Sequence, residues 1–228
     1  MTEPRDKEHW AAHVEHLAAE GLPEGVRSDT VAGRRLMSPL QGFGQMWQKT
    51  YRIPVPGHTP EEVIATWKAE YGRFWPTYNK FYAPIAGIKP GEVGLIKGAS
   101  GPVRLSTGVM VLSADDVSFT YMTPQGHPFA GWITFSADRE DGVTHAQAFA
   151  LIRANDPLYE LGFMFGGNRQ EDRMWQHTLR SLAEYLGAPG EVTTTKIKVD
   201  RKRQWRQFGN IRHNSAIRTM LRRGAGGK

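Results

Sequence analysis

Cysteine is absent from the 228-residue chain. A disulfide framework, a thiolate nucleophile, an iron–sulfur cluster and a cysteine-ligated zinc site are therefore all excluded. No apolar run approaches the roughly 18–20 residues that a membrane-spanning helix needs. Residues 1–20 carry charges throughout and contain no apolar segment of the kind found in secretory signals. We therefore expect a cytoplasmic protein.

The common catalytic signatures are missing as well. The chain contains no nucleophile elbow, no glycine-rich phosphate loop and no triad-like arrangement. Gly162, Gly166 and Gly167 match neither nucleotide-binding fingerprint, because they fall inside an expected helix and not after a strand. We accordingly expect no cofactor, and the sequence leaves open whether the protein is an enzyme.

Three histidines near the N-terminus, His9, His13 and His16, are spaced so that they would share one face of a helix. Imidazoles placed in this way could bind zinc, nickel or copper. The His-Glu-x-x-His arrangement is absent, however, and the same spacing suits the polar shoulder of an amphipathic helix. We therefore expect no metal site.

Aromatic residues are plentiful, with 7 Trp, 10 Phe and 7 Tyr, and hydrophobic residues make up 39% of the chain, enough for a sizeable core. The formal net charge of +6 is unevenly distributed. Residues 193–228 hold 11 basic residues and 1 acidic residue, whereas the rest of the chain holds 18 basic and 22 acidic residues. A mildly acidic body therefore carries a strongly basic C-terminal tail.

The N-terminal segment predicts a helix. Trp10, Val14 and Leu17 follow helical spacing, and glycine and proline end the pattern shortly afterwards. We divide the chain into an N-terminal helical arm with its loop, a body and a basic C-terminal extension, at residues 1–43, 44–188 and 189–228.

The body predicts mixed α and β structure. A strand at residues 44–55 precedes a helix that begins at Thr59, with Pro60 at its first position and Glu62 completing a capping box. The aromatic and proline-rich residues 74–84 predict an irregular or short helical connection. Five runs with strand composition follow, separated by short turns that imply an antiparallel meander, at residues 92–97, 103–112, 117–122, 129–137 and 144–153.

A long helix closes the body, beginning at Asp156-Pro157 and ending at Gly187. The three glycines inside it each cost about 1 kcal/mol relative to alanine. They therefore indicate a kink, close packing or room left for a ligand.

This element order resembles that of the helix-grip fold of the START, polyketide-cyclase and pollen-allergen superfamily, often called SRPBCC. The residues 42–51 (GFGQMWQKTY) and 129–132 (FAGW) are similar to a bacterial branch of it. The resemblance covers residues 44–187 and implies an α+β protein in which a curved antiparallel sheet wraps around a long C-terminal helix. It also implies a deep apolar cavity that holds a lipid, polyketide or other hydrophobic molecule, although fold alone does not establish function.

We expect a hydrophobic small molecule or lipid to be the partner of this cavity. Aromatic side chains are the candidate ligand-binding residues, since ligand sites are mostly apolar. The alternative is that these side chains belong to the core. The candidates are Phe74, Trp75, Tyr78, Phe81, Tyr82, Trp132, Phe149, Phe165 and Trp175.

An enzyme that uses the same cavity, such as a cofactor-independent cyclase, dehydratase or hydrolase, is the alternative function. Its acid–base groups would have to reach the substrate. The candidates are His145, Glu160, Asp172 and His177, each of which could equally be a structural residue. His127 falls in an expected hairpin turn.

The C-terminal extension has several interpretations. Residues 192–199 alternate and have high β propensity, so they could pair with a sheet edge. The cations and aromatics that follow suit an anionic membrane surface, and a third hypothesis is a protein that acts through this tail at the inner membrane face. Nucleic acid is a less favoured partner. Alternatively, the tail docks on the acidic body. The residues concerned are Arg201, Lys202, Arg203, Trp205 and Phe208.

Overall fold

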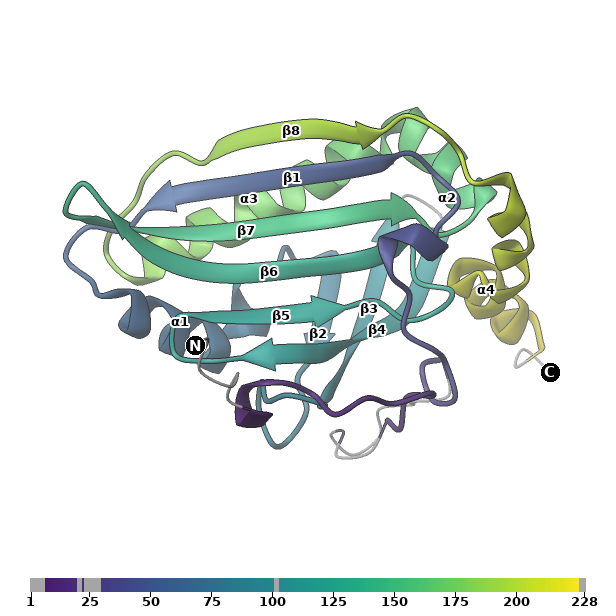
Figure 1. The fold of residues 1–228 in the computed structure, drawn as a ribbon, viewed down its shortest axis with the longest axis horizontal. Helices are drawn as coiled ribbons and strands as arrows, with labels where there is room; N and C mark the ends of the chain where they lie inside the picture. Colours follow the sequence, from purple (N-terminus) through teal and green to yellow (C-terminus); the bar gives the residue numbers. More distant parts are fainter. Residues whose placement is uncertain (1–6, 20–21, 23–29, 101–102, 226–228) are drawn as a thin grey trace, which may run out of the picture.

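A computed structural model describes residues 7–19, 22, 30–100 and 103–225 of the chain. Its centre is one eight-stranded antiparallel sheet, with strand order β2-β3-β4-β5-β6-β7-β1-β8, and the long helix lies behind it in Figure 1. The strands are β1 Met46–Pro54, β2 Asn79–Tyr82, β3 Val93–Ser100, β4 Val103–Ala114, β5 Ser118–Met122, β6 Phe129–Glu140, β7 Val143–Ala154 and β8 Thr193–Asp200.

The helical elements comprise four α-helices, shorter 3-10 turns and one π turn in the part of the chain that is described. The α-helices are α1 Pro60–Ala69, α2 Pro157–Gly162, α3 Asn168–Tyr185 and α4 Ser215–Ala225. The 3-10 turns are Lys7–His9, Pro39–Gln41, Tyr71–Phe74 and Trp205–His213, and the π turn is Phe163–Gly167.

The expected α+β architecture is confirmed. The five strand-like runs form the meander β3 to β7, and the last of these strands, β7, pairs with β1 from the start of the body. The capping box of α1 is present, since the Thr59 hydroxyl accepts a hydrogen bond from the Glu62 amide and the Glu62 carboxylate accepts one from the Thr59 amide. The sheet curves around α3 in the manner of a helix-grip fold (Figure 1).

One connection was predicted wrongly. Within residues 74–84, which predict an irregular or short helical connection, Asn79–Tyr82 forms the edge strand β2 and pairs with β3. Four residues are too few to show a strand period, so only the pairing with β3 reveals the strand.

The core lies between the inner face of the sheet and the helices α1 and α3. Trp67 of α1 sits edge-on to Phe119 and Phe135, with ring centroids 6.0 and 5.0 Å away. Leu179 and Leu182 of α3 are fully buried. Aromatic pairs in such geometry add to the stabilisation that burial alone provides. The inner face therefore fixes where both helices lie.

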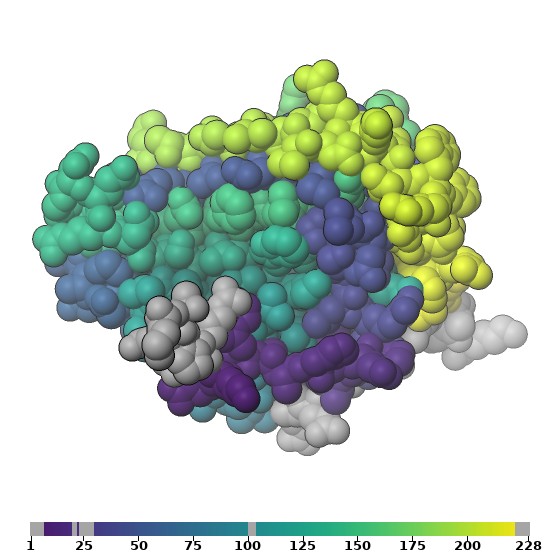
Figure 2. Space-filling view, in the orientation of Figure 1, coloured from purple at the N-terminus to yellow at the C-terminus, as the bar shows by residue number. Residues whose placement is uncertain are grey.

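The N-terminal arm is not the expected helix. Residues 10–19 contain no helix, and the arm crosses the outer face of the sheet as extended chain (Figure 2). Leu17 is buried there in a second apolar cluster with Val93 and Met110. A register shift between β4 and β5 leaves the carbonyl of Leu112 to accept a hydrogen bond from the Ala11 amide at 2.9 Å. Covering an apolar sheet face thus outweighs the local helical preference.

The three N-terminal histidines consequently do not share a helix face. His9 bonds through Nδ1 to the Ala114 carbonyl oxygen at 3.2 Å, while His13 and His16 are exposed. Among the described residues, no group of three or more His, Asp or Glu side chains is placed to hold a metal ion.

The closing helix is interrupted, as one of the three interpretations of its glycines predicts. At the π turn, Phe165 and Gly166 leave helical geometry, and Gly166 has a φ of +113°. Only glycine adopts such an angle without strain. Asp156 caps α2 by accepting hydrogen bonds from the Leu158 and Tyr159 amides at 2.9 and 3.1 Å. The helix therefore bends beside the sheet.

The beginning of the C-terminal segment is part of the sheet. β8 pairs with β1, as the alternation in residues 192–199 suggested. Buried Arg153 donates hydrogen bonds to the carbonyl oxygens of Gly44 (2.6 Å) and Lys202 (2.9 Å) and forms an ion pair with Asp200. The division of the chain at residues 43 and 188 stays a prediction.

The rest of the tail, after β8, docks at one end of the molecule (Figure 2). Trp205 and Phe208 stand edge-on to buried Phe43, with centroids 5.3 and 6.4 Å away. Arg203 forms an ion pair with Glu160 at 2.9 Å. Within the described ranges, no helix is both long and apolar enough to cross a membrane.

A buried ionic cluster fastens α3 to β1. Lys49, only 1% exposed, places its Nζ 2.6 Å from Glu171 and 3.1 Å from Asp172. The hydroxyl of Tyr51 donates to Asp172 at 2.7 Å, and Lys196 of β8 reaches the same carboxylate at 2.9 Å. Two cations therefore face two anions, and each carboxylate contacts at least one cation.

The pKa values in this cluster reflect burial and charge together. Burial by itself would lower the pKa of Lys49, but the two carboxylates raise it above its ordinary value. Burial raises the pKa of Glu171 even beside Lys49. Burial also opposes ionisation of Asp172, yet Lys196, Tyr51 and Lys49 together hold its pKa below the ordinary value. Glu171 is thus the carboxylate that depends most on Lys49.

We predict that Lys49→Met lowers the free energy of unfolding at pH 7 by about 3–5 kcal/mol, because it leaves a carboxylate buried without its cation. Loss of the cation raises the folded-state pKa of Glu171 further. The deficit should therefore be small below the unfolded carboxyl pKa of about 4.3, grow as the pH rises from there toward the raised folded value, and level off above it. Urea unfolding at several pH values measures it.

Lys196→Met is the matched control, since Lys196 is half exposed and exposed ion pairs contribute about 0–1 kcal/mol. Equal stability of the Lys49→Met variant and the original protein at pH 7 would show that the cluster does not fasten the helix.

Candidate ligand cavity

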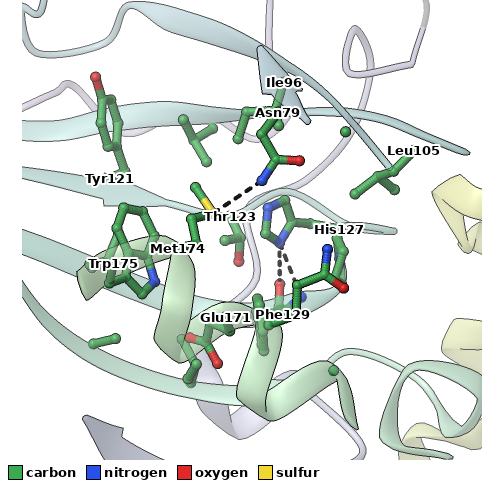
Figure 3. Close-up of a pocket in the computed structure, with 18 of the residues that line it drawn as sticks. Asn79, Ile96, Leu105, Tyr121, Thr123, His127, Phe129, Glu171, Met174 and Trp175 are labelled. Carbon is green, nitrogen blue, oxygen red and sulfur yellow. Dashed lines mark hydrogen bonds between the residues drawn. The ribbon is translucent and has the colours of Figure 1, made fainter. Parts of the chain in front are cut away.

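A cavity of about 220 Å³ lies between the inner face of the sheet, α3 and the π turn. Its lining is mostly aromatic and aliphatic, and Figure 3 shows part of it. Small residues on the strands, Gly98, Ala99 and Ala150, border the space. The bend in the closing helix places Phe163 and Gly167 at its margin. Of the glycines in the helix, Gly166 therefore allows the bend and Gly167 borders the cavity.

One wall of the cavity is formed by an aromatic cluster. Trp75 and Trp175 stand nearly perpendicular, with centroids 6.2 Å apart, and Trp175 also contacts Phe135 at 5.4 Å. Tyr71 and Tyr121 lie beside them at a centroid distance of 5.3 Å. These rings come from α3, β5, β6 and the turn after α1, so the wall forms only when the helices meet the sheet.

The π turn borders the cavity with a stacked ring pair. Phe163 lies parallel to Phe129 of β6, with centroids 4.4 Å apart. Gly167 is needed behind this ring, because a Cβ there would come within 2.7 Å of the Phe163 Cδ1 atom. The Asn168 side chain donates a hydrogen bond to the Phe163 carbonyl oxygen at 3.2 Å. The turn is thus held in place by the residues that form it.

Few polar side chains face this apolar space, and most of them already have partners. Thr123 exchanges hydrogen bonds with the Gly131 backbone, and Glu171 is paired with Lys49. Asn79 donates through Nδ2 to the sulfur of Met174 at 3.2 Å (Figure 3).

Two lining groups, Trp75 Nε1 and the Tyr121 hydroxyl, are buried without a hydrogen-bond partner in the described part of the chain. His127 also lines the cavity, and its Nδ1 lies 3.0 Å from the Phe129 amide nitrogen and 3.1 Å from the Phe129 carbonyl oxygen (Figure 3). Burial lowers the pKa of His127 to about 4, so the ring is uncharged at neutral pH. Among the residues that the structure describes, Nε2 has no hydrogen-bond partner.

The structure separates the nine candidate ligand-binding residues. Trp75, Trp132 and Trp175 line the cavity. Phe74 and Phe81 belong to the closed core. The remaining four lie elsewhere: Tyr78 and Phe165 are exposed, Tyr82 packs under the N-terminal arm, and Phe149 is half-buried on the outer face of β7.

The four candidate acid–base residues do not line the cavity. His145 bonds to the Val143 carbonyl oxygen, and His177 is exposed beside Ser181. Glu160 is held by Arg203, and Asp172 belongs to the ionic cluster. The structure therefore brings no two of them together in the cavity.

Sequence reasoning missed three polar residues of this region, Lys49, His127 and Glu171. Lys49 gave a signal, since it falls two residues before Tyr51 and four before Ile53 on the inward face of one strand. No feature of the neighbouring sequence distinguished Glu171 from Asp172. None indicated that His127 lines the cavity. A turn becomes a cavity wall only through the elements packed around it.

Comparisons with known proteins bear on the fold. No family profile and no curated protein matches the chain. It is similar to the solved structure of protein Ms6760 from Mycobacterium smegmatis, with 10% identity over 62% of this chain and 91% of that one, at a TM-score of 0.46.

Two further solved structures show likeness of the same degree. TTHA0849 from Thermus thermophilus is 12% identical over 63% of this chain and 97% of that one, at a TM-score of 0.43. Ara h 8.0201 is 10% identical over 62% of this chain and 97% of that one, at 0.41. The chain resembles helix-grip proteins in fold, as its sheet order and enclosed helix already show.

Proposed function

We propose that the protein binds a compact, mainly apolar small molecule in the cavity between the sheet and α3. The observation that carries this proposal is an apolar, partly open space of about 220 Å³ between the sheet and α3. Native cores are close-packed and contain few voids larger than a water molecule. A ligand that fills this space removes its apolar lining from water, which is favourable.

The size of the cavity sets the class of ligand. Pockets for drug-sized molecules measure about 300–1,000 Å³. A space of about 220 Å³ suits a molecule of one or two rings better than a long acyl chain or a four-ring skeleton. The proposed ligand is thus narrower than the lipid or polyketide that the family resemblance implies.

We predict that the purified protein binds 2-isopropenylnaphthalene but not testosterone in equilibrium dialysis. Ala150→Leu should weaken binding of the naphthalene about tenfold or more, because the added carbon atoms occupy the space from the floor of the cavity. Thermal unfolding checks that the variant is folded.

Ser136→Leu is the matched control, since it adds similar bulk to the neighbouring strand at a half-buried position outside the cavity lining. Equal binding by both variants, or a preference for testosterone, would show that the naphthalene does not occupy this cavity.

Association with an anionic membrane surface is the second candidate function, and an exposed apolar patch favours it. The patch consists of Leu158, Leu161, Met164 and Phe165 on α2 and the π turn, with Trp205 and Phe208 on the tail. Phe165, Trp205 and Met164 are 83%, 69% and 62% exposed. Contiguous exposed apolar surface marks interaction sites.

Cations surround this patch. Arg203 joins its two halves, contacting the sulfur of Met164 at 3.5 Å as well as Glu160. Arg201, Lys202 and Arg206 are exposed on the same segment. Both halves lie at one end of the molecule (Figure 1). Apolar side chains rimmed by cations suit a surface of anionic lipids, to which each cation contributes about 1 kcal/mol.

We predict that the protein sediments with vesicles of phosphatidylserine and phosphatidylcholine, and that added salt weakens binding through screening. The double change Met164→Ser and Phe165→Ser should weaken binding several-fold with little change in its salt dependence, because it removes apolar insertion and no charge. Ile85→Ser is the matched control, since Ile85 is 75% exposed in another loop.

Three results would contradict membrane association. One is an equal loss of binding with the Ile85 variant. Another is equal binding to vesicles of phosphatidylcholine alone. The third is binding of single-stranded DNA without binding of vesicles, which would favour nucleic acid as the partner of this surface.

A further inference from the structure

A second pocket, of about 330 Å³, lies where the strands β2, β3 and β4 meet α4. Three of its lining residues, Lys80, Lys97 and Arg104, are cations, and none of the described lining residues is acidic. The lining also includes four residues with hydroxyl groups, Thr77, Tyr78, Ser106 and Thr219. This composition is the opposite of that of the apolar cavity.

The register of the strands brings the cations to one face of the sheet. Lys80 of β2 stands directly opposite Lys97 of β3, and Lys97 stands opposite Ser106 of β4. Arg104 lies two residues before Ser106 and therefore shares its face of the strand. Leu95, two residues before Lys97, belongs to the apolar cluster under the N-terminal arm. The cations therefore lie on the outer face, away from the apolar cavity.

The two lysines lie close together without a balancing anion. The Nζ atoms of Lys80 and Lys97 are 4.9 and 5.0 Å from the centre of the same Tyr82 ring. That ring attracts both cations, but it carries no net charge that would cancel theirs. Like charges directly opposite one another on neighbouring strands destabilise a sheet.

No described carboxylate forms an ion pair with either lysine or with Arg104. A bound anion would therefore offset a repulsion that the described residues leave uncompensated.

The C-terminal helix completes one side of the pocket. The hydroxyl of Thr219 on α4 accepts a hydrogen bond from the Ser106 amide at 3.2 Å and donates one to the Ser215 carbonyl oxygen at 2.7 Å. β5 pairs with β4 only at Met110–Ala114, so α4 takes the place of a neighbouring strand beside Ser106. The docked tail thus fixes the wall opposite the lysines.

These side chains have the chemistry that binds phosphate. A guanidinium group donates two parallel hydrogen bonds to a phosphate, and ammonium groups add positive charge. A phosphate monoester carries about −1.5 to −2 charges at pH 7, which suits several cations better than a single carboxylate would. The volume of about 330 Å³ falls in the range of about 300–1,000 Å³ typical of small-molecule sites. The pocket therefore has room for more than the phosphate group.

We propose that this pocket binds a phosphate monoester through Lys80, Lys97 and Arg104. The proposal is independent of the apolar cavity, because the two sites lie on opposite faces of the sheet. A soluble sugar phosphate and the headgroup of phosphatidic acid both present this chemistry. The soluble probe is fructose 1,6-bisphosphate, with fructose and inorganic sulfate for comparison.

Isothermal titration calorimetry at low salt measures binding. The original protein should bind fructose 1,6-bisphosphate and not fructose, and added salt should weaken binding through screening. Lys97→Gln and Arg104→Gln should each weaken binding about 3- to 10-fold, because each removes one cation that contacts the phosphate. Lys89→Gln is the matched control, since Lys89 is exposed outside the pocket, and it should leave the affinity unchanged.

Thermal unfolding without ligand separates binding from a structural role. Lys97→Gln removes one of two opposed like charges, so the unfolding temperature should not fall although the affinity does. A loss of affinity accompanied by a clear loss of stability in both the Lys97 and the Arg104 variant would contradict the proposal. The double change Met164→Ser and Phe165→Ser, in the exposed apolar patch, should leave binding of the sugar phosphate unchanged.

Vesicles identify the source of the phosphate. Binding of fructose 1,6-bisphosphate that depends on Lys97 and Arg104 assigns the pocket to a soluble molecule. Sedimentation only with phosphatidic acid vesicles, and not with phosphatidylserine vesicles of equal surface charge, assigns it to a lipid headgroup if the same two variants weaken it. The proposal is wrong if sulfate binds as tightly as the sugar phosphate, if both variants bind like the original protein, or if neither probe binds. None of these results affects the cavity function, which the naphthalene tests separately.

Discussion

The position of α3 against β1 depends on a buried pair of charges. Lys49 points inward from the sheet, where an apolar side chain would be expected, and meets Glu171 and Asp172 on the helix. A buried cation tolerates only a narrow range of geometries, because each displaced carboxylate would lose its partner in a medium of low dielectric. Together with the buried Leu179 and Leu182, this constraint holds α3 over the sheet. The cavity beside Glu171 depends on this placement.

The cavity lies where neither the sheet nor the closing helix fills the space between them. On the sheet, the lining residues Gly98, Ala99 and Ala150 have small side chains that leave space above the strands. On the other side, the non-helical geometry of Gly166 bends the helix at the margin of this space. Beyond this region, Trp67, Phe119 and Phe135 are fully buried, and the Trp67 ring packs edge-on against the other two. The contrast between a tightly packed half and an open half of the same interior supports ligand binding more strongly than the fold alone.

The basic tail joins structure and function in an unexpected way. β8 extends the sheet and supplies Lys196 to the ionic cluster, while Ser215 supports the turn that carries His127 and Asn214 supports the start of α2. Its exposed aromatics and arginines remain available at the surface. Docking and partner binding were alternatives in the sequence, but they are compatible because Trp205 and Phe208 contact Phe43 and still stay 69% and 49% exposed.

The sequence by itself determined the elements whose signals are local. Alternation located the strands β3 to β7, capping chemistry located the start of α1, and the glycines indicated an interrupted closing helix. Tertiary structure alone decided the conformation of residues 10–19, which cover the sheet as extended chain because a buried apolar face outweighs helical propensity. It also decided which side chains border the cavity. His127 and Glu171 border it, while Phe149 and Phe165 do not. Whether a residue lines the cavity depends on how elements distant in the sequence pack together. The residue pattern along a single element does not contain that information.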